Sequence, residues 1–182
     1  MHIVSDSGLD NSAKGALMTL KPERQAVDMN EATHIRLAAE GDITRIVDLY
    51  RELTITTSKV EHGHSPSLAD YQLVFAEIRV DPRQKLLVVV EQGEVAGTIV
   101  LLVVPNLSHN GTPWAFLENL IVTERHRGRG LGRMLLEHAV GLARKSGCHM
   151  VELCSDVRRK EAHKLYNSIG FEAQAHCFRL FF

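Results

Sequence analysis

The nine residues from Arg125 to Arg133 carry the strongest chemical signal in the sequence, because they hold four arginines and three glycines. They follow a run of strand-forming residues and precede a pattern typical of an amphipathic helix. The first turn of a helix presents unpaired N–H groups and a positive partial charge, and glycines let a large anion approach the backbone closely. The composition and placement therefore predict a turn that binds a pyrophosphate.

Three other interpretations of this basic run fit less well. A solvated basic face or an RNA-binding arm is rarely flanked by an apolar strand and an amphipathic helix. A P-loop needs four residues between its glycines and then Lys-Ser or Lys-Thr, which are absent here. A Rossmann dinucleotide site is nearer, since Glu152 lies about 20 residues further on. Two observations argue against a Rossmann site. The spacing is G-x-G-x-G and not G-x-G-x-x-G, and only 54 residues follow Gly128, too few for the strands and helices that complete such a fold.

Two motifs together resemble one protein family. The pattern R/Q-x-x-G-x-G/A is present at Arg127, Gly130 and Gly132, after the strand sequence LENLIV at residues 117–122. Further along, AHKLYNSIGF at residues 162–171 is similar to the signature A-x-x-L/F-Y-x-x-x-G-F. Over residues 33–182 the sequence resembles the GNAT superfamily of acyl-CoA-dependent N-acyltransferases. It departs at Glu124, where many members have a proline that stiffens the turn without touching the ligand.

The resemblance implies a fold and a cofactor site. The fold is a mixed, partly splayed sheet with acetyl-CoA held in the splay as co-substrate. Backbone N–H groups of the glycine-rich turn would bind the pyrophosphate, the strand edge before it would pair with pantetheine, and an N–H near Leu120 or Ile121 would meet the oxyanion. The implied cofactor-binding residues are Leu120, Ile121, Val122, Arg127, Gly128, Arg129, Gly130, Leu131, Gly132 and Arg133.

The implied reaction is direct attack by an amine of a small molecule or a protein on the acetyl-CoA thioester. An alkylamine with a pKa of about 10.4 is neutral in only about one molecule in 2,500 at pH 7, so a base must take a proton. Glu118 is the candidate general base, and Tyr166 is the candidate proton donor to the leaving thiolate. Another role stays open for each residue. Glu118 could order the substrate or pair with an arginine, and Tyr166 could be a core aromatic. A regulatory acyl-CoA-binding module with little or no turnover is the alternative function.

The elements that must position these groups follow from periodicity and turn residues, which predict an α/β (α+β) fold of order βααβββαβαββ, a mixed sheet flanked by helices. The predicted strands cover residues 33–37, 86–91, 95–104, 114–122, 149–154, 171–175 and 177–182. The predicted helices begin near residues 43, 67, 131 and 156. The predicted last strand, at residues 177–182, is apolar. It could pair with a second copy of the chain or be covered within the monomer, and of these two we expect the homodimer.

Length and composition limit the number of domains and the classes of binding partner. The 182 residues with a net charge of -1 fit one domain at residues 32–182 behind an N-terminal arm at residues 1–31, which is flexible or loosely packed. The charge argues against a surface built for nucleic acid or membrane, and the longest apolar run, residues 99–104, is too short to span a bilayer.

The histidines and cysteines bear on metal binding and on the cellular compartment. His62 and His64 form the only close histidine pair, without a cysteine or carboxylate cluster, so no metal is predicted. Three cysteines without a C-x-x-C pair, and no secretory signal, favour reduced thiols and a cytoplasmic protein.

Overall fold

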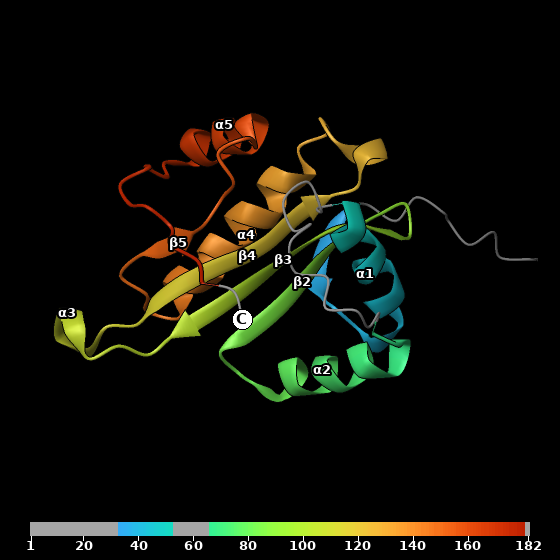
Figure 1. Ribbon diagram of the computed structural model, residues 1–182, viewed down its shortest axis with the longest axis horizontal. Coiled ribbons are helices and arrows are strands. Elements are labelled where there is room, and N and C mark those ends of the chain that lie inside the picture. The colour runs from blue at the N-terminus through green and yellow to red at the C-terminus, as the bar shows by residue number, and fades with distance from the viewer. Residues whose placement is uncertain (1–32, 53–65, 181–182) are drawn as a thin grey trace, which may run out of the picture.

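The computed structural model describes residues 33–52 and 66–180. The predicted arm at residues 1–31 and the His62–His64 pair lie outside the described residues. Within them, five strands form a single sheet in the order β1-β2-β3-β4-β5, with helices on both faces (Figure 1). Both the mixed sheet and its flanking helices confirm the predicted fold class.

Four of the strands pair antiparallel. They are β1 (His34–Leu37), β2 (Gln84–Glu91), β3 (Glu94–Val104) and β4 (Trp114–Val122). Strands β2 and β3 are rich in β-branched residues and are joined by Gln92 and Gly93, both with positive φ, which is the hairpin that the sequence predicts. The last strand, β5 (Val151–Leu153), is parallel to β4 and shorter than the predicted strand at residues 149–154.

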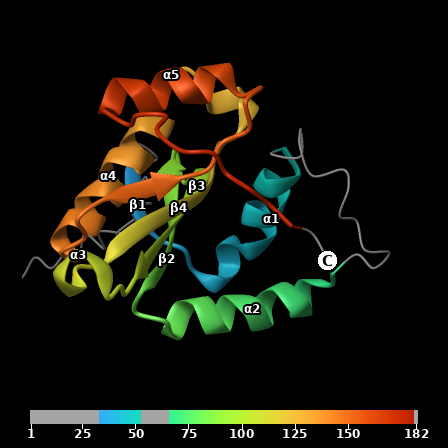
Figure 2. The same ribbon diagram turned by 60° about the vertical axis from the view of Figure 1, so that its left-hand side comes forward.

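The helices bury opposite faces of this sheet. Helices α1 (Ile43–Glu52) and α2 (Leu68–Val80) pack with alternate β2 residues such as Val88, and α4 (Leu131–Lys145) packs with the other set, such as Val89. Helix α5 (Lys160–Ile169) joins the second layer through Tyr166. Figures 1 and 2 show the two layers on either side of the strands. The short turns at Glu40–Asp42, Ser108–Gly111 and Glu124–His126 complete the described elements.

The sheet opens between β4 and β5. Their pairing covers Ala115 to Leu117 of β4 and stops there, although β4 continues to Val122. From residue 118 onward, the edge of β4 that faces β5 has no strand beside it. Among the described residues, the topology therefore leaves backbone polar groups of β4 beyond Leu117 without a strand partner on this side.

The two predicted closing strands, at residues 171–175 and 177–182, are wrong for the described part, because residues 171–180 contain no strand. Helix α5 ends at Gly170, whose φ of 101° stops the helix, and Phe171 packs back edge-on against Tyr166 with ring centroids 6.2 Å apart. Beyond it, Phe178 and Leu180 are 91% and 80% exposed. An alternating pattern forms a strand only where a neighbouring edge accepts it, and this segment instead crosses the open side of the sheet (Figure 2). No described helix is long and apolar enough to cross a membrane.

Candidate active site

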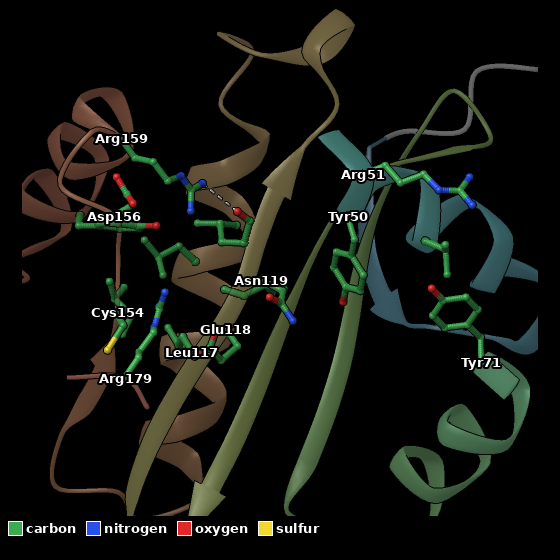
Figure 3. A pocket seen from close by; sticks show the side chains of 16 residues that line it. Tyr50, Arg51, Tyr71, Leu117, Glu118, Asn119, Cys154, Asp156, Arg159 and Arg179 are labelled. Atoms are coloured by element: carbon green, nitrogen blue, oxygen red, sulfur yellow. Dashed lines mark hydrogen bonds between the residues drawn. The ribbon is translucent and has the colours of Figure 1, made fainter. Parts of the chain in front are cut away.

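A cavity of about 440 Å³ opens where β4 and β5 separate. Its walls come from α1, α2, β3, β4, α4, β5, α5 and the C-terminal segment. Figure 3 shows polar side chains on β4 itself and on both sides of it. The lining residues are Val47, Tyr50, Arg51, Tyr71, Ile99, Leu117, Glu118, Asn119, Leu120, Leu136, Leu153, Cys154, Asp156, Arg159, Tyr166 and Arg179. Both candidate catalytic residues, Glu118 and Tyr166, are among them.

An irregularity in β4 lies at the cavity wall. Val100 of β3 pairs with Glu118, but Thr98 pairs with Ile121, so two β4 residues face one β3 residue at this point. Asn119 adopts a φ of 54°, a left-handed conformation that asparagine tolerates better than most residues. Such bulges re-aim side chains, and here the bulge follows directly on the candidate base.

Glu118 is half-buried in the cavity wall. Burial raises the pKa of its carboxyl, while the positive charge of Arg179 and the backbone N–H of Asn119 act in the opposite direction. A raised pKa makes a carboxylate a stronger base, which suits proton abstraction at neutral pH. The position and the environment of Glu118 are therefore compatible with the predicted role.

Tyr166 is 6% exposed and reaches the same cavity from α5. Burial raises the pKa of its phenol; the positive charge of Arg159 and a hydrogen bond with Ser155 oppose the rise, and the negative charge of Glu118 adds to it. The phenol therefore stays protonated at neutral pH and can act as a donor. Tyr166 is also a core aromatic, so the two roles weighed from the sequence are both present in one side chain.

The glycine-rich turn has room for an anion. Gly128 and Gly130 have φ values of 78° and 85°, and a Cβ built on either one meets no atom within 4 Å. Helix α4 starts at the next residue, Leu131, so its first N–H groups lie at this turn. The open space above two left-handed glycines at a helix start fits the pyrophosphate of acetyl-CoA.

The arginines of this turn are all paired with glutamates, a feature that the sequence did not predict. The hairpin turn between β2 and β3 supplies two partners, and α1 and α4 supply one each. The pairs are Arg125 with Glu94, Arg127 with Glu52 at 3.8 Å, Arg129 with Glu91 at 3.4 Å, and Arg133 with Glu137 at 3.0 Å. The ion pairs fix the turn, so that its backbone rather than its net charge is what it presents to an anion.

The predicted pantetheine edge also has guanidinium neighbours. Arg159 donates to the carbonyl oxygen of Leu120 at 3.2 Å, and the Nε of Arg127 donates to that of Val122 at 3.1 Å. Ile121 lies between them on β4 and is 5% exposed. Backbone groups at this open edge are suited to bind an extended amide chain, and one such chain would compete with Arg159 for the Leu120 carbonyl.

Sequence reasoning missed several cavity residues. Tyr50 lines the cavity, and burial raises the pKa of its phenol to about 12, while the polar side chains of Thr98 and Asn119 act in the opposite direction. Arg179 was placed in a strand and instead faces Glu118 across the cavity (Figure 3). The loop at residues 105–113 contributes no residue to the cavity lining.

Comparison with known proteins decides the family. The sequence profile of the acetyltransferase (GNAT) family matches residues 44–171, which is more than half of the chain. The chain belongs to the GNAT family. Both motifs and both candidate catalytic residues lie inside the matched region, whereas Arg179 lies beyond it.

Individual GNAT relatives agree with this assignment. The chain is 36% identical over 76 residues to the N-acetyltransferase YhdJ of Bacillus subtilis, a match of 41% of this chain and about half (54%) of that protein. It is 32% identical to the aminoalkylphosphonate N-acetyltransferase of Salmonella typhimurium over 59% of this chain and 70% of the relative. A solved structure from Agrobacterium tumefaciens that carries an acetyltransferase assignment superposes with a TM-score of 0.72 at 31% identity, covering 81% of this chain and 98% of that one.

The GNAT assignment establishes an acetyl-CoA-dependent N-acetyltransferase that acts on an amine acceptor. Among the described residues, no group of three or more His, Cys, Asp or Glu side chains is arranged to hold a metal ion. The family leaves the acceptor and the roles of individual residues to be argued from the site.

Proposed function

We propose that this N-acetyltransferase transfers the acetyl group directly to a primary amine of a small molecule or a protein, with Glu118 as general base and Tyr166 as general acid. The observation that carries the proposal is that both side chains line one cavity beside the open edge of β4. Burial is the main cause of the raised pKa of Tyr166, and the negative charge of Glu118 adds to it. The two groups are therefore close enough to serve one reaction centre.

The cofactor site is proposed at the turn and strand edge described above. The backbone of residues 127–133 would bind the pyrophosphate, and residues 120–122 would pair with the pantetheine amides. When bound there, acetyl-CoA supplies the thioester carbon that is attacked and the thiolate that leaves. The GNAT assignment and the open glycines at the start of α4 support this placement.

The residues of the chain then move the protons. Glu118 accepts a proton from the acceptor ammonium, directly or through water, and so restores the neutral nucleophile. A new bond forms between nitrogen and the acetyl carbon, and the bond from that carbon to sulfur breaks. Tyr166 donates its phenolic proton to the departing sulfur. The second proton that leaves the attacking nitrogen passes to the tyrosinate, directly or through water, and Glu118 releases its proton to solvent. The overall change is therefore an ammonium and a thioester giving an amide, free CoA thiol and one proton.

A thiol-release assay with acetyl-CoA and a panel of amines tests the proposal. We expect Glu118→Gln to lower kcat/KM at pH 7 by about 10²- to 10⁴-fold and to abolish the acidic limb of the pH profile. Tyr166→Phe should lower kcat while leaving the free energy of unfolding almost unchanged. Undiminished turnover of either variant would remove that residue from the mechanism. Binding of acetyl-CoA without CoA release for any acceptor would indicate the regulatory module instead.

A further inference from the structure

The C-terminal segment brings one arginine into the cavity. Arg179 lines the cavity together with Glu118, and in Figure 3 its side chain reaches towards β4 from beside Cys154. Its neighbours in sequence, Phe178 and Leu180, are 91% and 80% exposed. All three residues are exposed, but Arg179 is the one of the three that lines the cavity.

Among the described residues, Arg179 is the arginine of the cavity lining without a protein acceptor. Of the other two lining arginines, Arg159 donates to the carbonyl of Leu120, and Arg51 pairs with Asp48 at 2.6 Å. Within the described residues, no carboxylate lies within 4.0 Å of the Arg179 guanidinium, and it donates no side-chain hydrogen bond to another described residue.

The positive charge of Arg179 acts on the reaction centre itself. It opposes the rise in the pKa of Glu118 that burial causes, and it adds a small part to the lowering of the pKa of Asp156 that comes mainly from Arg158. A cation placed so near the base also repels the ammonium form of an acceptor. A plain alkylamine would meet this repulsion uncompensated, whereas an acceptor with its own anionic group would pair with the guanidinium.

The segment that carries Arg179 is tied to the cavity rim. The thiol of Cys177, two residues earlier, lies close enough to that of Cys154, which follows β5, to raise the pKa of Cys154, together with burial, to about 11. A planar guanidinium held in this way presents the paired donors that match carboxylate and phosphoryl oxygens.

We infer that Arg179 binds an anionic oxygen group of the acceptor, so that the preferred substrates are primary amines carrying a carboxylate or phosphoryl group a few bonds from the nitrogen. The inference rests on the proposed function and names the substrate class of that site. It draws on a residue beyond the region matched by the family profile. Acceptor choice in this chain would then depend on its last few described residues.

Matched acceptors test the inference. β-Alanine is compared with β-alaninamide, and 2-aminoethyl phosphate with 2-aminoethanol, so that each pair differs in its anionic group and the two pairs separate carboxylate from phosphoryl recognition. By CoA release, we expect the wild type to prefer the anionic member of at least one pair by about 10- to 100-fold in kcat/KM, the range of a charge-assisted hydrogen bond. Arg179→Gln should abolish that preference, Arg179→Lys should retain part of it, and the KM for acetyl-CoA should not change in either variant.

The control is Arg83→Gln, which removes an exposed guanidinium paired with Asp81 outside the cavity and should keep the wild-type preference. A second readout is the acidic limb of the pH profile with the neutral acceptor. It should move to higher pH in Arg179→Gln, because the cation that lowers the pKa of Glu118 is lost. Equal kcat/KM within both pairs, unchanged in Arg179→Gln, would overturn the inference and leave the proposed function standing. No CoA release with any acceptor would overturn both.

Discussion

Replacement of Glu91 by glutamine tests how the glycine-rich turn is held in place. The Oε2 of Glu91 lies 3.4 Å from the Nη1 of Arg129 and 3.4 Å from the Nε2 of His126. Glu91 and His126 are nearly buried, and the Nδ1 of His126 has no hydrogen-bond partner. In this arrangement one carboxylate at the end of β2 joins two residues of the turn.

The expected magnitude follows from the Arg129 pair alone, because His126 is charged only when protonated. Two unit charges 3.4 Å apart interact by about 1 kcal/mol in water and about 5 kcal/mol at an effective dielectric constant of about 20. The Arg129 side chain is 52% exposed, so the value near water applies, and the loss is about 1–2 kcal/mol. If the turn must be ordered to bind acetyl-CoA, its KM rises by about 5- to 30-fold.

The assay is CoA release at saturating acceptor with acetyl-CoA varied. Glu91→Gln should raise the KM for acetyl-CoA and leave kcat within about twofold, since it does not touch the proposed reaction centre. Glu137→Gln is the matched control. It breaks the exposed pair with Arg133 on α4, a pair of the kind that contributes about 0.3–0.5 kcal/mol, and should change KM by less than about twofold.

Equal effects of the two substitutions would refute the reasoning, as would a fall in kcat without a change in the acetyl-CoA KM. A double substitution of Glu91 and Arg129 provides a further check. Because the two residues form one pair, the second change should add little to the first.

Three more predictions concern packing, charge and pH. Gly97→Ala places a Cβ 2.6 Å from the carbonyl oxygen of Ile121, so we expect the free energy of unfolding in urea to fall by about 1–3 kcal/mol. Asp42→Asn removes an acceptor of two hydrogen bonds, at 2.5 and 3.0 Å, from the Arg36 guanidinium and should lower that free energy by about 1–3 kcal/mol at pH 7. Because the pKa of Asp42 is lowered, this contribution is present above the ordinary aspartate pKa of about 3.9 and is lost as the pH falls below it. Because burial raises the pKa of Glu118, the acidic limb of kcat/KM should have its midpoint above the ordinary glutamate value of about 4.3.

These expectations have matched controls. Gly141→Ala lies in the middle of α4 with no atom within 4 Å of the new Cβ, so it should be neutral or stabilise by about 1 kcal/mol. Asp48→Asn removes an exposed pair and should cost less than about 1 kcal/mol. A Gly97→Ala protein as stable as the wild type, a pH-independent effect of Asp42→Asn, or an acidic midpoint at or below about 4.3 would each contradict its prediction.

Much of the fold could be predicted from the sequence, because it depends on residues that are close together in the chain. The hairpin at Gln92–Gly93, the start of α4 and the stop at Gly170 depend on residues a few positions apart, and the structure has all three. The motifs likewise identified the family. That Glu118 and Tyr166 line one cavity was expected from the resemblance, and their catalytic roles stay predictions.

The ion pairs of the glycine-rich turn and the position of Arg179 depend on contacts between distant parts of the chain, which the periodicity of a single segment does not encode. Residues 38 positions apart form the Glu91–Arg129 pair, and no pattern in either segment indicates the other. The alternation around Arg179 indicates which side chains share a face, but not whether another strand is there to pair with. Without that neighbour, the segment forms no ladder, and its exposed Arg179 lies at the cavity instead.

The four ion pairs of residues 125–133 also affect how the cofactor arrives. Although this segment reads as a patch of four positive charges, each charge has a glutamate as its counterion within the protein. Such a surface projects little long-range potential, so diffusing acetyl-CoA gains little electrostatic steering towards it. Its capture then depends on short-range backbone contacts, and the association rate constant should vary only weakly with ionic strength, unlike that of a ligand drawn to an unbalanced basic patch.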